Sequence, residues 1–566
     1  MRNHKLFSTV LGLLSLSIVA CGSGTQSDDD DGADPGTVNP GQSGGGGQAA
    51  PDAAVPPGCD ATKTPSQDAC VVNETLGVFV APASADAAAD SPDGTRGHPF
   101  TKMQDAIDAA KNQKKRVYAC AGTYAEQIVI ADGVSMFGDL DCNQSWSVVT
   151  DKHASVNAPA SPAARADQIQ SATRIESIDI VAPDGTSEAP SSIALIATSS
   201  PALVIASSTI HAGKGMNGAD GVQGEQLSNA ASANGVDNSN ALLEDCSGFS
   251  QNPTPCWLRH RTASAGGTNA CLGSSRSFVA GSGASGGTAI GDAVVASGTT
   301  FFEFGNQYYM TPAYLATDGN AAGSAAGGVR GNAANAAGTN GASGATGANG
   351  ASAAAAGAIS AQGFVTADGT AGGDGQVGQG GAGGAGYDYV TESSTSYPTG
   401  DAIYFTNGGG GGAGGCPGVA GTAGKGGGAS IAIIAVDSPI TLDTCNVQAS
   451  DAGEGGKGTF GSNASGGGIG GADHDPGACN PTGFINCLNH PRTHEGGNGG
   501  SGGNSGWSGS GAGGSSIGIA YRGAQVVLVS SVPTNGAAGV GVAAMTSGAK
   551  TIPATPAGVA SLAVSF

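Results

Sequence analysis

Glycine recurs at every third position in four separate stretches of this chain, and this period restricts the possible folds more than any other feature. The stretches are 338–350, 369–384, 409–427 and 497–509. A three-residue period matches one turn of a polyproline-II-type helix. Because the stretches are not contiguous and contain almost no proline, they do not suit a collagen triple helix. Two interpretations remain: a bundle of polyglycine-II helices whose backbones approach closely, and a disordered glycine-rich linker.

The composition predicts a thin and repetitive core. The 566 residues include 101 Gly but only 14 Phe, 10 Tyr and 3 Trp, so few large side chains are available to fill a broad interior. Such a chain is expected to build its core from repeats. Its 44 acidic and 22 basic residues give a formal net charge of -22. This balance argues against nucleic acid or an anionic membrane surface as a partner, because both require clustered Lys and Arg.

Residues 1–20 have the pattern of a signal peptide. Arg2 and Lys5 precede an apolar run that extends from Leu6 to Ala20. The run is shorter than the roughly 20 residues that a membrane-spanning helix needs, and no later stretch predicts a span. The segment Ile18–Cys21 resembles the lipobox of bacterial lipoproteins, which implies that Cys21 carries a lipid anchor. An ordinary signal peptide with a cysteine near its cleavage site is the alternative.

Residues 21–58 are predicted to be a lipidated, disordered tether, since they show no hydrophobic periodicity. Gly22 follows Cys21, which under the enterobacterial sorting rule points to the outer membrane. The acidic run Asp28–Asp31 resembles the surface-export signals of some lipoproteins, and a solvated linker is the alternative. We therefore expect an outer-membrane lipoprotein that faces the cell surface.

The remaining cysteines of an exported chain are expected to form disulfides. Short spacings predict the pairs Cys59 with Cys70, Cys120 with Cys142, Cys246 with Cys256 and Cys479 with Cys487, and a longer spacing pairs Cys416 with Cys445. The odd count leaves one thiol over, Cys271, or Cys256 if Cys271 takes its place. Spacing alone leaves the connectivity open.

Residues 59–150 are predicted to form an N-terminal module of one helix and several short strands. Thr101 is a candidate N-cap for a helix in which Met103, Ala106, Ile107 and Ala110 share one face. Strands are expected at 78–80, 116–120, 127–130 and 134–137, with turns at Gly122 and Gly133. A spacing of roughly ten residues between short strands suits a solenoid.

This module resembles the start of right-handed parallel β-helix proteins of the pectate-lyase-like superfamily, especially a lipoprotein-associated domain of unknown function. The matching positions are Val78, Val80, Pro82, Asp86, Gly94, Thr95, Pro99, Phe100, Met103, Ala106, Ile107, Ala110, Val117, Gly122 and Tyr124. The resemblance implies a stack of coils whose open apolar end is covered by the helix. It implies no particular activity.

Internal repeats predict that residues 151–566 continue the stack. Similar strand-turn-strand segments begin at Ser191, Ala429 and Ser515, and a degenerate copy begins at Gly357. Their aliphatic residues suit strands buried in a narrow parallel solenoid, and these are Ile193, Leu195, Ile431, Ile433, Ile517 and Ile519. The predicted fold class is therefore all-β, a right-handed parallel β-helix with a short N-terminal capping helix, interrupted by polyglycine-II-like arms. The composition of the arms resembles that of glycine-rich surface proteins of mycobacteria and myxobacteria.

An insertion at 225–330 contains a cluster of aromatic residues. The cluster comprises Phe301, Phe302, Phe304, Tyr308, Tyr309 and Tyr314. Aromatic rings can stack on sugar rings, which makes the cluster a candidate binding site. A local core beneath the insertion is the alternative.

Candidate metal ligands gather between Asp473 and His494. They are His474, His490 and His494, although Cys479 and Cys487 beside them lack zinc-finger spacing. A disulfide-closed loop with exposed histidines is the alternative. One Gly-Gly-x-Gly-x-Asp unit at 383–388 matches a calcium-binding repeat, and otherwise no cofactor is expected.

The sequence contains no signature of a polysaccharide-degrading enzyme. Its one tight basic group, Arg259–Arg261, lies in the insertion, and Gly97–His98 is followed by Pro99 rather than by glycine. Asp139 and Asp141 are expected to cap turns, while carboxylates brought together by different coils are invisible in a sequence. We therefore expect a non-catalytic structural or adhesive surface protein, held to the membrane by its lipid anchor and contacting polysaccharides or other cell-surface components. A polysaccharide lyase or glycoside hydrolase on the same scaffold is the alternative.

Overall fold

The computed structural model describes residues 58–83, 91–238, 263–288, 317–329, 335–386, 407–473 and 494–566, together with the backbone of five further strands. Two compact units divide the chain, Met1–Ala54 and Val55–Phe566. The predicted signal peptide, Cys21 and most of the tether lie outside the described residues. The second unit contains every described helix and strand.

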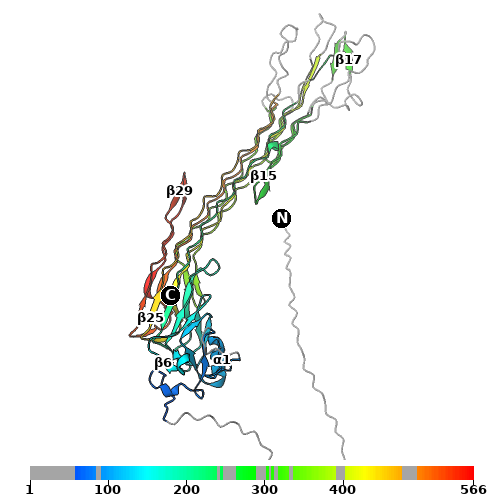
Figure 1. Ribbon diagram of the computed structural model, residues 1–566. Helices are drawn as coiled ribbons and strands as arrows, with labels where there is room; N and C mark the ends of the chain where they lie inside the picture. The colour runs from blue at the N-terminus through cyan, green and yellow to red at the C-terminus, as the bar shows by residue number, and fades with distance from the viewer. Residues whose placement is uncertain are drawn as a thin grey trace, which may run out of the picture. The chain divides into compact units, whose positions relative to one another are not determined.

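Three parallel sheets make up most of the regular structure of this unit (Figure 1). The first sheet consists, in order, of β1 (Gly77–Val80), β2 (Arg116–Cys120), β5 (Met136–Asp141), β9 (Thr173–Glu176), β12 (Leu203–Ala206), β24 (Thr441–Asp443) and β27 (Val527–Val529), with β6 (Ser147–Val148) antiparallel to β5. The second consists of β3 (Gly122–Tyr124), β7 (Ala154–Asn157), β10 (Ile178–Val181), β13 (Thr209–Ala212), β25 (Asn446–Ala449) and β28 (Val532–Thr534). The third consists of β4 (Ile128–Ile130), β8 (Ala164–Asp167), β11 (Ser192–Thr198), β23 (Ser430–Val436), β26 (Ser516–Arg522) and β31 (Ala560–Ser565).

Consecutive strands enter the three sheets in rotation. The strands β2, β3 and β4 belong to the first, second and third sheets in turn, and β5, β7 and β8 then pair with them in the same order. Each further round adds one strand to every sheet. Inward-facing side chains from all three sheets form one apolar cluster that reaches from Val78 to Ile519. The described residues are therefore mostly strands in parallel sheets, in agreement with the all-β prediction.

Helix α1 (Met103–Gln113) contacts β1, β2 and β4 and is buried along the predicted face of Met103, Ala106, Ile107 and Ala110. The prediction of Thr101 as its N-cap is wrong, because Lys102 occupies that position and makes no side-chain cap bond. The Glu126 carboxylate accepts the free N–H groups of Met103 at 2.6 Å and Gln104 at 3.1 Å instead. A carboxylate near this end also suits the positive end of the helix dipole.

The other helices among the described residues are three single turns, η1 (Ala69–Val71), η2 (Cys142–Gln144) and η3 (Ala231–Ala233). Asp141 caps η2 as predicted, because its side chain accepts from the Asn143 N–H at 3.1 Å. No helix in the described part of the chain is both long enough and apolar enough to cross a membrane.

The internal repeats that begin at Ser191, Ala429 and Ser515 lie directly beside one another. Their strands β11, β23 and β26 pair in register, so that Ile193 lies beside Ile431 and Ile431 beside Ile517. All six predicted core residues of these strands are buried. A continuous apolar run is explained by burial on both faces, since Leu195 and Ile433 face the inner cluster while Ile193 and Ile431 belong to a separate outer cluster.

The fourth, degenerate repeat at Gly357 is not a further coil, and that prediction is wrong. It forms an antiparallel hairpin of β19 (Ala358–Ser360) and β20 (Gly363–Val365). Ile359 and Phe364 of this hairpin pack on the outer apolar cluster of the third sheet. The hairpin therefore covers the second buried face of β11 and β23.

Candidate functional site at the distal end of the glycine segments

Three long excursions leave the sheets at equivalent places. Residues 213–429 join β13 to β23, residues 450–515 join β25 to β26, and residues 535–559 join β28 to β31. Each excursion therefore departs after a strand of the second sheet and returns at a strand of the third. We call their described residues outside the hairpins the glycine bundle, and Figure 1 shows its segments side by side, running away from the strands.

The segments of the bundle are joined by backbone hydrogen bonds at every third residue. In one parallel pair, the N–H groups of Gly338, Gly341, Gly344, Gly347, Gly350 and Ala353 donate to the carbonyls of Glu495, Asn498, Ser501, Asn504, Trp507 and Ser510, over 2.6–2.9 Å. In one antiparallel pair, the N–H groups of Gly496, Gly499, Gly502, Gly511 and Gly514 donate to the carbonyls of Gly471, Gly468, Ser465, Gly456 and Gly453, over 2.9–3.0 Å. The segments thus follow the three-residue period of the sequence as hydrogen-bonded neighbours rather than as independent linkers.

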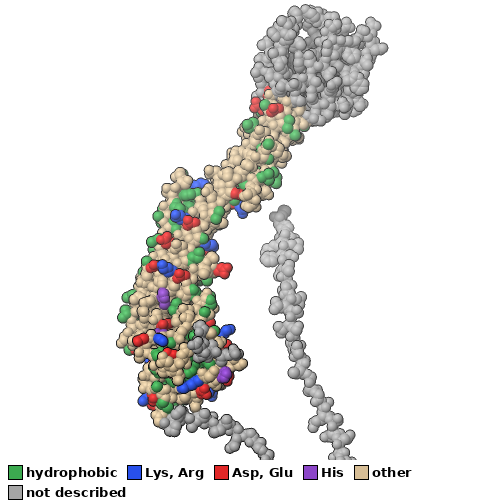
Figure 2. Space-filling view, viewed as in Figure 1, with side chains coloured by type: hydrophobic (Ala, Val, Ile, Leu, Met, Phe, Trp, Pro, Cys, Tyr) green, Lys and Arg blue, Asp and Glu red, His purple; other side chains and the backbone are tan. Residues whose placement is uncertain are grey.

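Close approach of backbones explains why glycine is needed at this period. A Cβ atom added to Gly499 would lie 1.8 Å from the Ala413 carbonyl oxygen, and one added to Gly500 would lie 2.0 Å from that of Ala342. Both distances are far below any real contact, so a side chain there would force the segments apart. Most of the visible surface of the described bundle is coloured as backbone and uncharged polar side chains (Figure 2).

Side-chain oxygens on one segment accept backbone N–H groups of the next, a contribution that sequence analysis missed. Asn217 accepts from Glu454 at 2.9 Å and Asp220 from Lys457 at 2.7 Å. Further along the same two segments, Asn234 accepts from Ile469 at 2.9 Å and Asp237 from Ala472 at 2.8 Å. The sequence feature that could have predicted these bonds is the three-residue spacing of Asn and Asp within 217–220 and 234–237.

The ends of the segments farthest from the sheets meet in one place. Gly287 donates to Gly384 at 2.8 Å, Gly386 donates to Thr317 at 3.0 Å, and Gly409 donates to His494 at 3.0 Å. The side chains of Asn238 and Asn407 continue this network, donating to Asp473 Oδ1 at 3.0 Å and to Ser264 Oγ at 2.7 Å. We call this group of residues the distal end.

Four long stretches of sequence begin and end at the distal end. They are 239–262, 289–316, 387–406 and 474–493. Described backbone in them includes an antiparallel sheet in the order β14 (Leu242–Asp245), β22 (Ala402–Thr406) and β21 (Tyr387–Val390), and a hairpin of β17 (Phe301–Phe304) and β18 (Gln307–Met310). Segments that are far apart in the sequence are therefore gathered at one end of the bundle.

The predicted aromatic binding residues belong to this region. Phe301, Phe302 and Phe304 are in β17, and Tyr308 and Tyr309 are in β18, whereas Tyr314 lies outside the described residues. More broadly, 14 of the 27 Phe, Tyr and Trp residues of the chain fall within the four stretches. The stretches thus contain half of the aromatic residues in less than a fifth of the sequence.

Of the predicted metal ligands, only His494 lies within the described residues. Its ring is 5% exposed, and Nδ1 lies 3.0 Å from the Ala385 carbonyl oxygen. Burial lowers the pKa of His494, an effect that the negative charge of Asp473 opposes. Among the residues that the structure describes, no group of three His, Cys, Asp or Glu side chains could hold a metal ion. His474 and His490 lie outside them.

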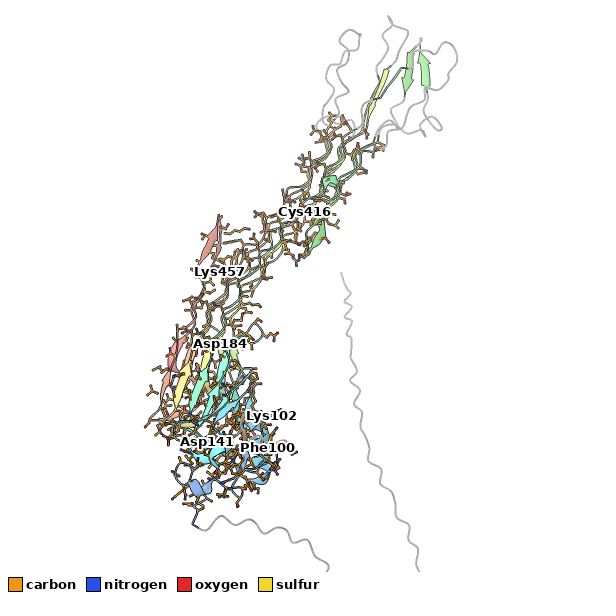
Figure 3. The ribbon with its side chains drawn as sticks, in the orientation of Figure 1. Phe100, Lys102, Asp141, Asp184, Cys416 and Lys457 are labelled. Carbon is orange, nitrogen blue, oxygen red and sulfur yellow. A yellow bond between two sulfur atoms is a disulfide. The ribbon has the colours of Figure 1, made fainter. Side chains whose placement is uncertain are left out.

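The structure contains the predicted disulfides Cys59–Cys70 and Cys120–Cys142, but it pairs Cys416 with Cys271. The predicted bond between Cys416 and Cys445, and the prediction of Cys271 as the free thiol, are therefore wrong. Cys416 lies well along the glycine bundle (Figure 3), beside β15 (Ala270–Leu272) and its hairpin partner β16 (Ser277–Val279).

Among the described cysteines, the one without a disulfide partner is Cys445, which is buried in the turn between β24 and β25. Its Sγ lies 3.2 Å from the Ile205 carbonyl oxygen. Burial raises the pKa of this thiol. The remaining predicted pairs, Cys246 with Cys256 and Cys479 with Cys487, lie outside the described residues.

The first sheet brings two carboxylates together from neighbouring strands. Asp139 follows Phe137 in β5, and Phe137 lies beside Glu176 of β9. Both carboxylates are about 95% buried, Oδ1 of Asp139 has no hydrogen-bond partner, and burial raises the pKa of Asp139 with a further contribution from the charge of Glu176. Glu176 is held by Ser66 Oγ and Arg174 Nε, each at 2.5 Å. Asp139 is therefore not the turn cap that we predicted, and a pair so enclosed is not open to a polymer.

Comparisons with protein-family models, with curated proteins and with solved structures gave no match to this chain.

Proposed function

We propose that this chain is a surface lipoprotein with a structural or adhesive role, which holds the four stretches of its distal end away from an anchored base. The observation that carries the proposal is the convergence, at one end of the bundle, of four stretches that together hold half of the aromatic residues of the chain, while the described residues of the bundle show no other evident ligand site. Aromatic residues are enriched in binding surfaces because they bury much apolar area at little cost in conformational entropy.

The proposed scaffold has two parts. The rotation of the strands through three sheets and the resemblance of the N-terminal module support a right-handed parallel β-helix with a capping helix. The hydrogen bonds at every third residue support polyglycine-II helices in the glycine bundle. At about 3.1 Å per residue, the path from Gly453 to Gly471 corresponds to about 55 Å, so the distal end would stand well clear of the sheets.

The proposed anchor is the lipid on Cys21, which would hold the chain at the outer membrane with its distal end toward the outside. Loops presented on a rigid scaffold are the usual position for binding residues. Polysaccharides and other cell-surface components are the partners that a group of aromatic residues on an acidic chain would suit, and nucleic acid would be repelled.

The test incubates the purified full chain with bacterial and plant polysaccharides in the presence of calcium, and follows the polymer size by chromatography. The chain is expected to co-elute with at least one polymer without shortening it. The double variant Tyr308→Ser, Tyr309→Ser is expected to lose co-elution, whereas Phe460→Ser, which removes an aromatic ring from the glycine bundle, is expected to retain it. Falling polymer mass would establish the carbohydrate-active enzyme instead, and equal binding by both variants would contradict a distal site.

The proposed location is tested on intact cells. Externally added protease is expected to cleave the chain in cells that carry the native lipobox, and Cys21→Ala is expected to release the chain from the membrane fraction. Full protection of residues 59–566 from the protease would contradict surface exposure.

A further inference from the structure

Four Asn–Gly pairs of the glycine bundle hold a neighbouring segment by the same two hydrogen bonds. In each pair, the asparagine Oδ1 accepts the N–H of one residue on the neighbour, and the glycine N–H donates to the carbonyl of that same residue. The pairs Asn217–Gly218, Asn234–Gly235, Asn340–Gly341 and Asn349–Gly350 hold Glu454, Ile469, Asn498 and Trp507, with the first bond at 2.8–3.3 Å and the second at 2.6–2.8 Å. We call this arrangement the Asn–Gly clamp.

The glycine of each clamp is required by the packing of the bundle. A Cβ atom on Gly218 would lie 2.0 Å from the Lys425 carbonyl oxygen, and one on Gly341 would lie 2.2 Å from that of Gln379. A larger residue at these positions would force the segments apart. The chain therefore cannot avoid the Asn–Gly sequence by changing its second residue.

The first position of the clamp requires only an oxygen atom that accepts an N–H group. Asp220 and the glycine after it hold Lys457 in the same way, with both bonds at 2.7 Å. The Ser352 hydroxyl accepts the Ser510 N–H at 3.2 Å, and the N–H of Ala353 donates to the Ser510 carbonyl at 2.9 Å. Conversion of a clamp asparagine to aspartate would therefore leave the clamp intact.

An Asn–Gly pair that is not held in place reacts with itself, and the missing glycine Cβ leaves the attack unhindered. The glycine nitrogen loses its proton to the solvent and attacks the asparagine Cγ. A bond forms between the nitrogen and Cγ, and the bond between Cγ and Nδ2 breaks as the amide takes up a proton and leaves as ammonia. Water then opens the resulting succinimide ring at one of its two carbonyls, which gives aspartate or isoaspartate. Isoaspartate continues the chain through its side-chain carbon and adds one atom to the backbone.

The clamp restrains both groups that take part in this reaction. The glycine N–H is directed at a carbonyl of the neighbouring segment, and the asparagine Oδ1 is directed at an N–H of the same residue, so Cγ cannot turn toward the glycine nitrogen unless a bond breaks. Burial is not the cause of protection, since the four asparagines are exposed. Protection depends on the neighbouring segments remaining side by side.

We propose that the four clamp asparagines are latent modification sites, which stay closed while the glycine bundle is intact and convert to isoaspartate once its segments separate. The added backbone atom moves the later glycines of a segment out of the three-residue register. A converted segment can then no longer pair with its neighbours along its whole length, so a transient separation of the segments becomes permanent. This inference concerns the bundle alone and is independent of the adhesive role.

The test incubates the purified full chain in mildly alkaline buffer, folded in one sample and unfolded by guanidinium chloride in the other. Mass spectrometry of peptides follows the replacement of each amide by a carboxyl group, and chromatography separates the aspartate from the isoaspartate products. In the folded chain the four asparagines are expected to convert about 100-fold more slowly or less, because conversion requires local opening. Equal rates in the two samples would overturn the proposal.

Glu454→Pro tests the clamp at Asn217 directly. Proline suits an extended segment of this period but has no N–H, and the Glu454 N–H is the group that Asn217 accepts at 2.9 Å. Conversion at Asn217 is expected to rise by about 5-fold, which corresponds to the loss of one hydrogen bond, while conversion at Asn349 stays at the wild-type rate. Ala472→Pro is the matched control, because it removes the N–H that Asp237 accepts at 2.8 Å. Equal rates at Asn217 in the two variants would contradict the role of the clamp.

Refolding tests whether conversion is what makes the separation permanent. Wild-type chain that was unfolded briefly should regain slow amide exchange in peptides from 338–350, whereas chain held unfolded until the four sites have converted should not. A variant that combines Asn217→Ser, Asn234→Ser, Asn340→Ser and Asn349→Ser keeps an accepting oxygen, as at Ser352, but cannot form a succinimide at these positions. This variant should recover a larger share of its slow exchange after the same time in denaturant. Equal recovery by the variant and the wild type would overturn the proposal.

Discussion

Substitution of one inward-facing glycine by alanine tests whether close backbone contact holds the bundle together. Gly500 lies between three other segments, since its N–H donates to the Gln379 carbonyl and its carbonyl accepts from Gly415, both at 2.8 Å. A Cβ atom on Gly500 would lie 2.0 Å from the Ala342 carbonyl oxygen. Gly466 belongs to the same bundle, but a Cβ atom there would have no neighbour within 4 Å. The pair Gly500→Ala and Gly466→Ala therefore differs mainly in the contact under test.

The stability that Gly500→Ala is expected to lose depends on the hydrogen bonds beside Gly500. Relief of the clash requires the two segments to separate by more than 1 Å, since real Cβ contacts are not shorter than 3.0 Å. The flanking bonds from Gly341 to Asn498 and from Gly344 to Ser501, both 2.8 Å, would then break. Two bonds at about 1 kcal/mol each and about 2 kcal/mol for overpacking give a loss of about 4 kcal/mol. Gly466→Ala should instead stabilise by about 0.4–1 kcal/mol, because alanine restricts the unfolded chain.

Amide hydrogen exchange read by mass spectrometry separates these outcomes by region. In Gly500→Ala, peptides from 338–350 and 495–507 should exchange about 1000-fold faster than in the wild type, which corresponds to about 4 kcal/mol of opening free energy. In Gly466→Ala, the same peptides should exchange at the wild-type rate or more slowly. Equal protection in the two variants would refute the reasoning, and unprotected segments in the wild type would refute the bundle itself.

Three further predictions concern the cysteines and a buried carboxylate. Replacement of Cys271 and Cys416 by Ser, which opens a loop of 145 residues, should lower the free energy of unfolding by about 3–5 kcal/mol, and denaturant melts that match the wild type would contradict this. Cys445 should resist iodoacetamide in the native state, because burial raises the pKa of its thiol, and should react fully once unfolded, as intact mass would show. The raised pKa of Asp139 implies stability that is present below its ordinary pKa of 3.8 and is lost as the pH rises through the folded-state pKa. Asp139→Asn should therefore be more stable than the wild type at about pH 7 but not at about pH 3, and a constant difference would argue against the titration.

The sheets could be anticipated from the sequence because their signals are local. The apolar runs at Ser191, Ala429 and Ser515 define both the strands and their register, and the structure pairs Ile193, Ile431 and Ile517 in one row. The copy at Gly357 carries a similar signal, but its two strands are joined by a tight turn and return on each other. Periodicity indicated an apolar face in each case, and it could not show whether that face would be part of the parallel sheets or would cover them from outside.

Long-range contacts account for the incorrect predictions. Thr101 is a good N-cap by residue type, yet Glu126, which lies 23 residues after Met103, accepts the Met103 N–H in its place. Cys416 and Cys445 are close in sequence, but one lies in the bundle and the other between two sheets, so the partner of Cys416 is 145 residues away. Short sequence spacings cannot predict contacts over such separations, because these contacts depend on where each excursion leaves and re-enters the sheets.

The location of the distal end could have been predicted from the positions of the glycines in the three-residue period. In the excursion between β25 and β26, the outgoing segment pairs with the returning one from Gly453 beside Gly514 to Gly471 beside Gly496, and each step of three along one segment is a step of three back along the other. Equal lengths out and back place residues 474–493 at the far turn. The same argument places 387–406 between the antiparallel pair of Gly384 and Gly409. An interruption of the three-residue glycine period therefore marks a turn at the end of a segment, and the aromatic-rich interruptions fall together because the segments beside them have matching lengths.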